Sequence, residues 1–166
     1  MAETRWLDDH EQETWRAFMA ATRLLDGVLD RQLQRDAGMP HAYYVILAML
    51  SEAADRTLTM TELACATHSS ASRLSHAVRR LEDQGLVVRR PHPTDGRTTL
   101  AILTDAGYAA LAEAAPGHVA EVRRVLFDRL TPDQVRRLNE ISREILAAMG
   151  KQPLGEVSGG GETNAG

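Results

Sequence analysis

The chain has 166 residues, of which 43% are hydrophobic and 25% are charged, enough for one compact domain with a buried core. Its net charge of -4 excludes a protein coated in basic charge, so any contact with nucleic acid must come from a local basic patch. No apolar run has the length of a signal sequence or a membrane-spanning helix, and the single cysteine, Cys65, excludes an internal disulfide. We therefore expect a cytoplasmic protein with no cofactor and no bound metal.

Two helices are predicted in the first fifty residues. From about residue 10 to residue 35, apolar side chains recur at three- and four-residue steps, which indicates an amphipathic helix that ends at Gly38. Its stripe contains Trp15, Phe18, Thr22, Leu25 and Leu29. After Pro40, residues 43–50 are apolar nearly all round and predict a second helix that is buried on most sides. We interpret the second helix as core scaffold.

The region from residue 59 to residue 85 has the pattern of two short helices. Thr59 and Glu62 have the spacing of a reciprocal capping box, which predicts a helix that runs to about residue 67. Ser69 is the expected N-cap of the next helix, which should run to residue 84 and stop at Gly85. The two helices would be joined by a tight turn.

The second of these short helices has one apolar face and one polar face. At 100° per residue, Leu74, Val78 and Leu81 fall on the same side and should point into the core. The opposite face is formed by Ser72, His76, Arg79 and Asp83, flanked by Arg73 and Arg80. The face turned away from the core is therefore polar and largely basic.

A β-hairpin is predicted directly after this helix. Residues 86–90 and 98–103 have the β-branched content of strands, and Asp95 with Gly96 supplies turn chemistry between them. Between His68 and Leu103 the chain carries a net charge of +3, opposite in sign to the whole. Two short helices followed by a hairpin with an arginine at its tip fit a DNA duplex, the helix in the major groove and the wing in the minor groove.

Two further helices and a tail complete the chain. An apolar pattern from residue 104 to residue 130 predicts a long helix with a kink or break at Pro116. Thr131, Pro132 and Gln134 have the spacing of an N-cap, a first helical proline and a capping-box partner, and they open a last helix that Gly150 closes. Residues 151–166 are expected to be disordered, because the glycine-rich end has no apolar content to bury.

Four fragments of the chain follow the order and spacing of a known family. They are Thr61-Glu62-Leu63-Ala64, the run of residues 80–89, Asp95-Gly96-Arg97, and the run of residues 103–107. Over roughly residues 10 to 150, the chain resembles the MarR family of bacterial transcription regulators. The resemblance implies a mainly α fold with a small β-hairpin wing. Residues 1–150 would form a single domain, with a winged helix-turn-helix over 56–104 and dimerisation helices over 10–35 and 105–150.

The resemblance also implies a homodimer that binds a palindromic operator in double-stranded DNA. The implied contacts are Ser69, Ser70 and Ser72 at the start of the recognition helix, Arg73, His76 and Arg79 along it, Arg89 and Arg90 beside the wing, and Asp95 and Arg97 at its tip. Hydroxyls at the helix start would hold phosphates, and arginines along the helix would reach base edges or the backbone. The tip arginine would enter the minor groove, directed by the aspartate paired with it.

A second copy of the chain is also expected from the helices themselves. The apolar faces over residues 15–29 and 119–146 have no predicted sheet to cover them, and such faces usually mark association. Many members of the family bind small aromatic or phenolic ligands between these helices and the winged unit. Aromatic residues at helical spacing are more often core, so a ligand site remains the second interpretation for Trp15, Phe18, Tyr43 and Tyr44.

Several features have plainer interpretations. A polar helix face with arginines is often only a solvated face, and Asp95 with Arg97 can be a surface ion pair. Cys65 and His68 are three residues apart, but two ligands do not make a metal site, so a small buried structural cysteine is the better interpretation of Cys65.

The function predicted is a DNA-binding transcriptional regulator, and repression is the commoner mode in the family. The alternative is a dimer of the same fold that binds small molecules or proteins and has no operator affinity. An enzyme is disfavoured, because the sequence has no nucleophile elbow, no phosphate-binding glycine loop and no helical zinc motif.

Overall fold

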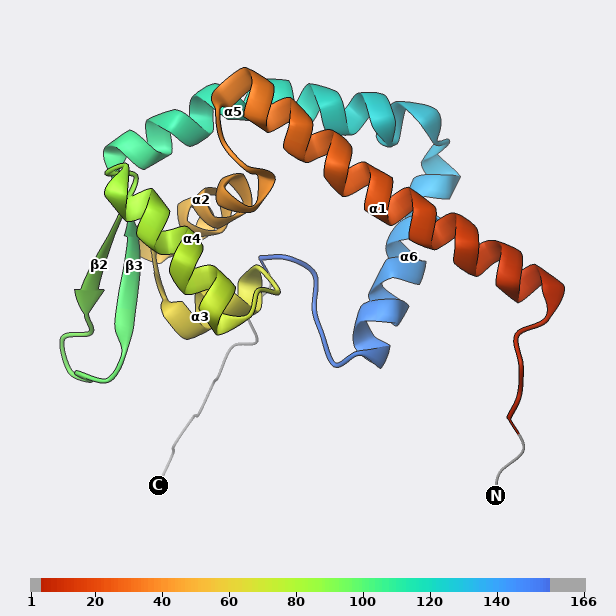
Figure 1. Cartoon of the computed structure of the whole chain (residues 1–166), viewed down its shortest axis with the longest axis horizontal. Coiled ribbons are helices and arrows are strands. Elements are labelled where there is room, and N and C mark those ends of the chain that lie inside the picture. The colour runs from red at the N-terminus through yellow and green to blue at the C-terminus, as the bar shows by residue number, and fades with distance from the viewer. Residues whose placement is uncertain (1–3, 156–166) are drawn as a thin grey trace.

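The computed structural model describes residues 4–155 and is mainly helical (Figure 1). In chain order the elements are α1 (Asp9–Ala37), α2 (His41–Glu52), the 3-10 helix η1 (Ala54–Arg56), β1 (Thr57–Thr59), α3 (Met60–Ala66), α4 (Ala71–Asp83), β2 (Val87–Pro91), β3 (Thr99–Leu103), α5 (Asp105–Val125), the 3-10 helix η2 (Phe127–Arg129) and α6 (Pro132–Ala148). Over residues 4–155 no helix is both long enough and apolar enough to cross a membrane.

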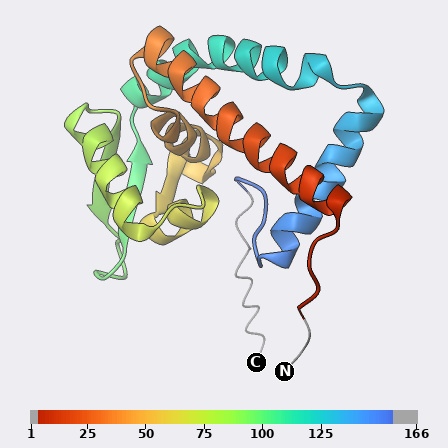
Figure 2. The same ribbon diagram turned by 45° about the vertical axis from the view of Figure 1, so that its right-hand side comes forward.

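The elements form a winged unit at one end and a helical arm that extends from it. Elements α2, α3, α4 and the sheet gather around one core, while the carboxyl-terminal part of α1 packs against α5 and the two helices then diverge (Figures 1 and 2). Helix α6 continues from the far end of α5, on the side of the molecule away from the wing. This arrangement agrees with the mainly α fold and hairpin wing expected from the sequence.

Most helix boundaries are set by local capping, as the sequence predicts. Thr59 accepts the backbone N–H of Glu62 at 3.1 Å, and the Glu62 carboxylate accepts the Thr59 N–H at 2.8 Å. Thr131 and Gln134 form the same reciprocal pair at the start of α6, with Pro132 in its first turn. Gly38, with φ of 62°, ends α1 in the left-handed conformation that glycine adopts without strain.

Two predicted boundaries are wrong. The N-cap of α4 is Ser70 rather than Ser69, because the Ser69 backbone N–H is used at the end of α3, where it donates to the carbonyl of Ala64 at 3.0 Å. Helix α5 ends at Val125 instead of reaching residue 130. The helix continues through Pro116, so of the predicted kink or break there is no break, and the single backbone hydrogen bond that proline cannot donate is tolerated.

The sheet has three antiparallel strands in the order β1-β3-β2. The predicted hairpin is confirmed, with Val87 opposite Leu103 and Arg90 opposite Leu100. Strand β1 was not predicted, since its three residues are too few to show alternation; it pairs with β3 and places Thr57 opposite Ile102. Because β1 leads directly into α3 and pairs with β3, it joins the start of α3 to the base of the wing.

The core lies inside the winged unit. Leu47, Leu63, Leu81 and Val87 are fully buried there, and they come from α2, α3, α4 and β2 in turn. The predicted inward face of α4 is confirmed, because all three of its apolar residues are buried. Fully burying each such side chain contributes about 1.5–3 kcal/mol, so this unit is stabilised by its own packing.

The helical arm is apolar but uncovered. Trp15 is 53% exposed, Phe18 is 41% exposed and Ile141 is 57% exposed, and α6 contains no buried residue. The interpretation of Trp15 and Phe18 as core residues is therefore wrong for a single chain. Their helix shows the expected amphipathic stripe, but no other element of residues 4–155 covers its amino-terminal half.

Residues 151–155 return from α6 to the winged unit. The imidazole Nε2 of His68 lies 2.8 Å from the carbonyl oxygen of Gln152, and the Gly155 N–H lies 3.4 Å from the carbonyl oxygen of Ala66. Leu154 lines a cavity of about 260 Å³ together with Asp26 and neighbouring residues of α2 and the α3–α4 turn. The rest of the segment predicted to be disordered, residues 156–166, lies outside the described residues.

Candidate nucleic-acid interface

The outward face of α4 is polar and open to solvent. The predicted contact residues Ser72, Arg73, His76 and Arg79 are all exposed, and the buried apolar face of the same helix fixes their direction. At the helix start, the Ser70 hydroxyl accepts the backbone N–H of Arg73 at 3.4 Å. The helix thus presents a row of hydrogen-bond donors that no other part of residues 4–155 covers.

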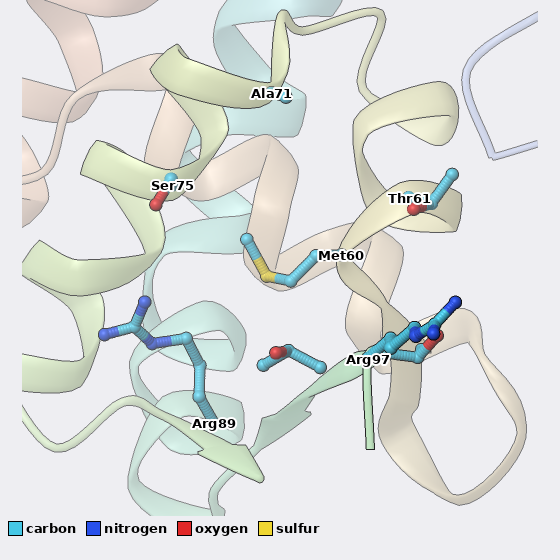
Figure 3. Close-up of a pocket in the computed structure, with 8 residues that line it drawn as sticks. Met60, Thr61, Ala71, Ser75, Arg89 and Arg97 are labelled. Atoms are coloured by element: carbon cyan, nitrogen blue, oxygen red, sulfur yellow. The ribbon is translucent and has the colours of Figure 1, made fainter. Parts of the chain in front are cut away.

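A groove of about 290 Å³ lies between α4, the start of α3 and the wing (Figure 3). It is lined by Met60, Thr61, Ala71, Ser75, Arg89, Arg97, Thr98 and Thr99. In the close-up, Arg89 lies on the side of Ser75, whereas Arg97 lies on the side of Thr61. Hydroxyls and two guanidinium groups around one concavity are the side chains that bind phosphate oxygens in protein–DNA contacts.

Asp95 orders the wing tip through the backbone. Its Oδ1 accepts the backbone N–H of Arg97 at 3.0 Å, and its Oδ2 accepts the Thr98 hydroxyl at 2.6 Å. These two hydrogen bonds, the hydroxyl of Thr98 first, lower the pKa of the Asp95 carboxyl. The expected ion pair between Asp95 and the Arg97 guanidinium is not formed within residues 4–155, so Asp95 shapes the turn and leaves the Arg97 side chain exposed.

Arg89 is tied to the end of α4. Its Nε and Nη2 donate to Oε2 of Glu82 at 2.9 and 2.6 Å, and its backbone N–H donates to Oε1 at 3.2 Å. These hydrogen bonds and the positive charge of Arg89 lower the pKa of the Glu82 carboxyl. Arg90, the next residue, is exposed and forms no ion pair in the described part of the chain.

The sequence reasoning missed several groove residues. Thr61, Ser75, Thr98 and Thr99 line the groove, and none of them was among the expected contacts. Ser75 had a usable signal, because it follows Ser72 by three residues and precedes Arg79 by four, on the exposed side of the helix. The three threonines had no such sequence signal, because their place in the groove depends on how the wing lies beside α3.

The four aromatic residues considered for a ligand site lie in two different environments. Tyr43 and Tyr44 are half-buried against the core, whereas Trp15 and Phe18 are exposed on α1. The ring of Tyr44 lies 4.3 Å from that of His118 on α5, centroid to centroid. Burial, and to a smaller extent the charge of Glu52, raise the pKa of the Tyr44 hydroxyl.

Cys65 is exposed, so its interpretation as a buried structural cysteine is wrong. Helix α3 is only two turns long and buries Leu63 and Ala66, which leaves Cys65 on its outer side. Within residues 4–155, no group of three or more histidine, cysteine, aspartate or glutamate side chains is placed to hold a metal ion.

Comparisons with known proteins place this geometry in a family. A family model described as MarR family matches residues 37–98. The chain is 54% identical to Sco3205, a MarR family transcriptional regulator from Streptomyces coelicolor solved in complex with DNA; the match covers 91% of this chain and 93% of that one, with a TM-score of 0.86. The chain belongs to the MarR family of transcriptional regulators.

Other members of the MarR family support the same assignment. AbsC, also a MarR family regulator from Streptomyces coelicolor, is 39% identical over 90% of this chain and all of its own, with a TM-score of 0.84. The HTH-type transcriptional repressor YetL of Bacillus subtilis (strain 168) is 32% identical over 89 residues, which are 54% of this chain and 53% of YetL. The match therefore spans about half the length of this curated relative.

Proposed function

We propose that this MarR-family chain is a homodimeric transcriptional repressor that binds a palindromic operator in double-stranded DNA. Residues 56–104 would contact DNA, with α4 in the major groove and the wing in the minor groove. The observation that carries the proposal is the exposed basic face of α4 beside a groove lined by Arg89 and Arg97. Sco3205, which is 54% identical, was solved in complex with DNA.

Charge on the winged unit supports a contact with phosphates. Among the described residues, Arg73, Arg79, Arg90 and Arg97 lie in no ion pair, so their charges are available to a ligand. The whole chain is acidic, with a net charge of -4, and a general affinity for polyanions is not expected. The affinity for DNA should therefore depend on this one surface. It should also fall steeply with salt: the logarithm of the binding constant should drop by about 0.9 per unit of log salt concentration for each phosphate neutralised.

The uncovered helical arm supports a second copy of the chain as the partner. Trp15, Phe18 and Ile141 are exposed in the single chain, on α1 and α6. Exposed apolar surface of this kind on helices usually marks an interface. Two-fold pairing through residues 10–35 and 105–150 would present two recognition helices about 34 Å apart, one turn of DNA.

A small aromatic effector that releases DNA is part of the proposal. Half-buried Tyr43 and Tyr44 lie at the boundary between the winged unit and the arm, where a ligand can favour one arrangement of the two over another. The competing function is a dimer that binds a small molecule or a protein without operator affinity. It would show the same association with no salt-dependent DNA binding.

The test is fluorescence anisotropy with a labelled duplex from upstream of the protein's own gene and a scrambled duplex, each at low and physiological salt. We expect binding to the upstream duplex at least about 100-fold tighter than to the scrambled one. Arg97→Ala should abolish this preference. Arg5→Ala, which removes an exposed arginine that precedes α1 and lies outside the proposed interface, is the matched control and should bind as the wild type does.

Light scattering of the same preparation decides the oligomeric state. A dimer that discriminates between the duplexes supports the proposal in full. A dimer that binds both duplexes weakly and equally, with no effect of Arg97→Ala, would favour the function without operator affinity. A monomer at micromolar concentration would contradict the proposed dimer.

A further inference from the structure

The ion pair between Glu82 and Arg89 joins two elements that approach DNA separately in the proposed function, the end of α4 and strand β2. A single carboxylate accepts hydrogen bonds from both the guanidinium and the backbone N–H of Arg89, at 2.6 to 3.2 Å. Both side chains are half-buried, at 34% and 32% exposure, so solvent screens this pair less than a fully exposed one. The contact therefore fixes the strand backbone as well as a charge.

The connection between α4 and β2 is restrained on its other side by the start of α5. The Leu86 N–H donates to the carbonyl of Leu81 at 2.9 Å, and the Thr104 hydroxyl donates to the carbonyls of Gly85 and Leu86 at 2.8 and 3.1 Å. Gly107 lies so close that a Cβ there would be 2.1 Å from the Leu86 carbonyl oxygen. Glu82 and Arg89 add a second restraint on the same junction, between α4 and β2 directly.

A small rotation at this junction displaces the wing tip by several ångströms. Strand β2 has five residues, and at about 3.3 Å per residue it spans roughly 16 Å. A rotation of about 10° at its base then moves its end by roughly 3 Å, whereas a preorganised site tolerates errors of about 0.5 Å. Arg97 lies beyond that end and depends on the angle of the hairpin.

The charge around Arg89 argues against a phosphate contact. Of the six arginines between His68 and Leu103, Arg89 is the one in an ion pair within the described residues. A phosphate that approached its guanidinium would also meet the Glu82 carboxylate. Arg90 is exposed beside it and has no such neighbour, so it is better placed to neutralise a phosphate.

We propose that Glu82 and Arg89 are positioning residues that set the angle between the wing and the recognition helix, and that Arg89 does not neutralise a phosphate. The inference rests on the proposed DNA binding and adds Glu82 to the residues that determine it. It replaces the phosphate contact that the family resemblance implies for Arg89.

Glu82→Gln distinguishes a positioning role of Glu82 from a purely electrostatic effect on DNA. The substitution keeps the side-chain shape and removes a negative charge near the DNA. If charge alone mattered, the substitution would strengthen binding to the upstream duplex. We expect instead a loss of about tenfold or more, with the salt slope of the wild type. Arg89→Ala should give the same loss and the same slope, whereas Arg90→Ala should lower the slope by about 0.9 for each phosphate released.

Two further variants separate positioning from a general loss of stability. Reversing the pair, Glu82→Arg with Arg89→Glu, restores the ion pair but not the hydrogen bond from the backbone N–H of residue 89, because a guanidinium accepts none. It should recover part of the lost affinity, which a phosphate contact at position 89 cannot do. Glu121→Gln is the matched control, because Glu121 accepts Nε and Nη2 of Arg124 at 2.9 and 2.6 Å on α5. Because Glu121 lies in the proposed dimerisation helices, this variant is the control for the distance measurement and not for DNA affinity.

A readout without DNA distinguishes a failure of this inference from a failure of the proposed function. Spin labels at Arg80→Cys on α4 and Thr94→Cys at the wing tip, in a Cys65→Ser background, report the distance between the two elements. Glu82→Gln should broaden this distance distribution, and Glu121→Gln should leave it unchanged. If the wild type bound neither duplex, the proposed function would be lost and the spin labels would still decide the inference.

The inference is overturned by either of two results. One is a Glu82→Gln variant that binds the duplex as tightly as the wild type, or more tightly, together with a lowered salt slope for Arg89→Ala. The other is an unchanged distance distribution in Glu82→Gln.

Discussion

The winged unit buries its apolar side chains within the single chain, whereas the helical arm leaves many of its own exposed. In the winged unit, Leu47, Leu63 and Val87 come from separate elements and are fully buried against one another. In the arm, Trp15 and Ile141 have the same hydrophobic character but are more than half exposed. The first region is stabilised by its own packing, whereas the second leaves exposed an apolar surface of the kind that usually marks association.

A charge introduced on the apolar face of the helical arm should have the largest effect, because it acts on the region that lacks a covering surface within residues 4–155. Ile141→Asp would bury a carboxylate in each of two copies of the proposed interface, at a cost on the order of 3–5 kcal/mol per copy. We expect a monomer by light scattering and loss of DNA binding. Ala147→Asp is the control, because position 147 lies on the opposite, polar face of α6; a monomer there would show that any charge on α6 disrupts the protein.

A cavity in the winged unit should have the second largest effect and a different signature. Leu81→Ala removes a fully buried side chain from α4 and should lower the free energy of unfolding by about 2–5 kcal/mol. Urea unfolding followed by circular dichroism measures the loss. Light scattering of the still-folded variant should give a dimer, and dissociation would mean that the two regions are not stabilised separately.

The sequence predicts the winged unit better than the arm, for a physical reason. Capping by Thr59 and Glu62, the stop at Gly85 and the turn at Asp95 are local, and residues a few positions apart determine them. The exposure of Trp15 depends on what covers it, and a stripe along one helix does not carry that information.

Contacts of the candidate site were predictable only where they depend on helix periodicity. The exposed face of α4 follows from the spacing of its apolar residues, which places Arg73, His76 and Arg79 outward. The pair between Glu82 and Arg89 depends instead on the angle of a strand after a left-handed glycine. No periodicity in the sequence encodes that angle.

The boundary of α4 offers a smaller, sharper test. Ser70→Ala should lower the free energy of unfolding by about 1 kcal/mol, because the Ser70 hydroxyl caps the backbone N–H of Arg73. Ser69→Ala is its neighbour control and should cost less, since the Ser69 hydroxyl makes only a 3.4 Å contact with the Thr67 carbonyl. Equal losses in thermal unfolding, or a larger loss for Ser69→Ala, would favour Ser69 as the cap.

The smallest expected effect is a dependence on pH where the arm meets the winged unit. Burial, and then the nearby charge of His41, lower the pKa of His118 below its ordinary 6.5. The unfolded chain therefore binds a proton at a pH where the folded chain does not, so stability falls as the pH drops through about 6.5 and levels off below the folded pKa. Urea unfolding between pH 8 and pH 5 should show this slope.

His118→Gln is the matching variant, because glutamine is polar and does not titrate. Its stability should change less with pH than that of the wild type over the same range. An equal slope in the two proteins would assign the pH dependence to other groups.

The contact between His68 and Gln152 joins residues that are 84 positions apart. At about 5–20 residues per second, a ribosome makes Gln152 roughly 4–17 s after His68. Every residue of the winged core has been synthesised by then, since the last of them is Leu111. The turn that precedes α4 therefore gains its contact with Gln152 only after every residue of the winged core has been made.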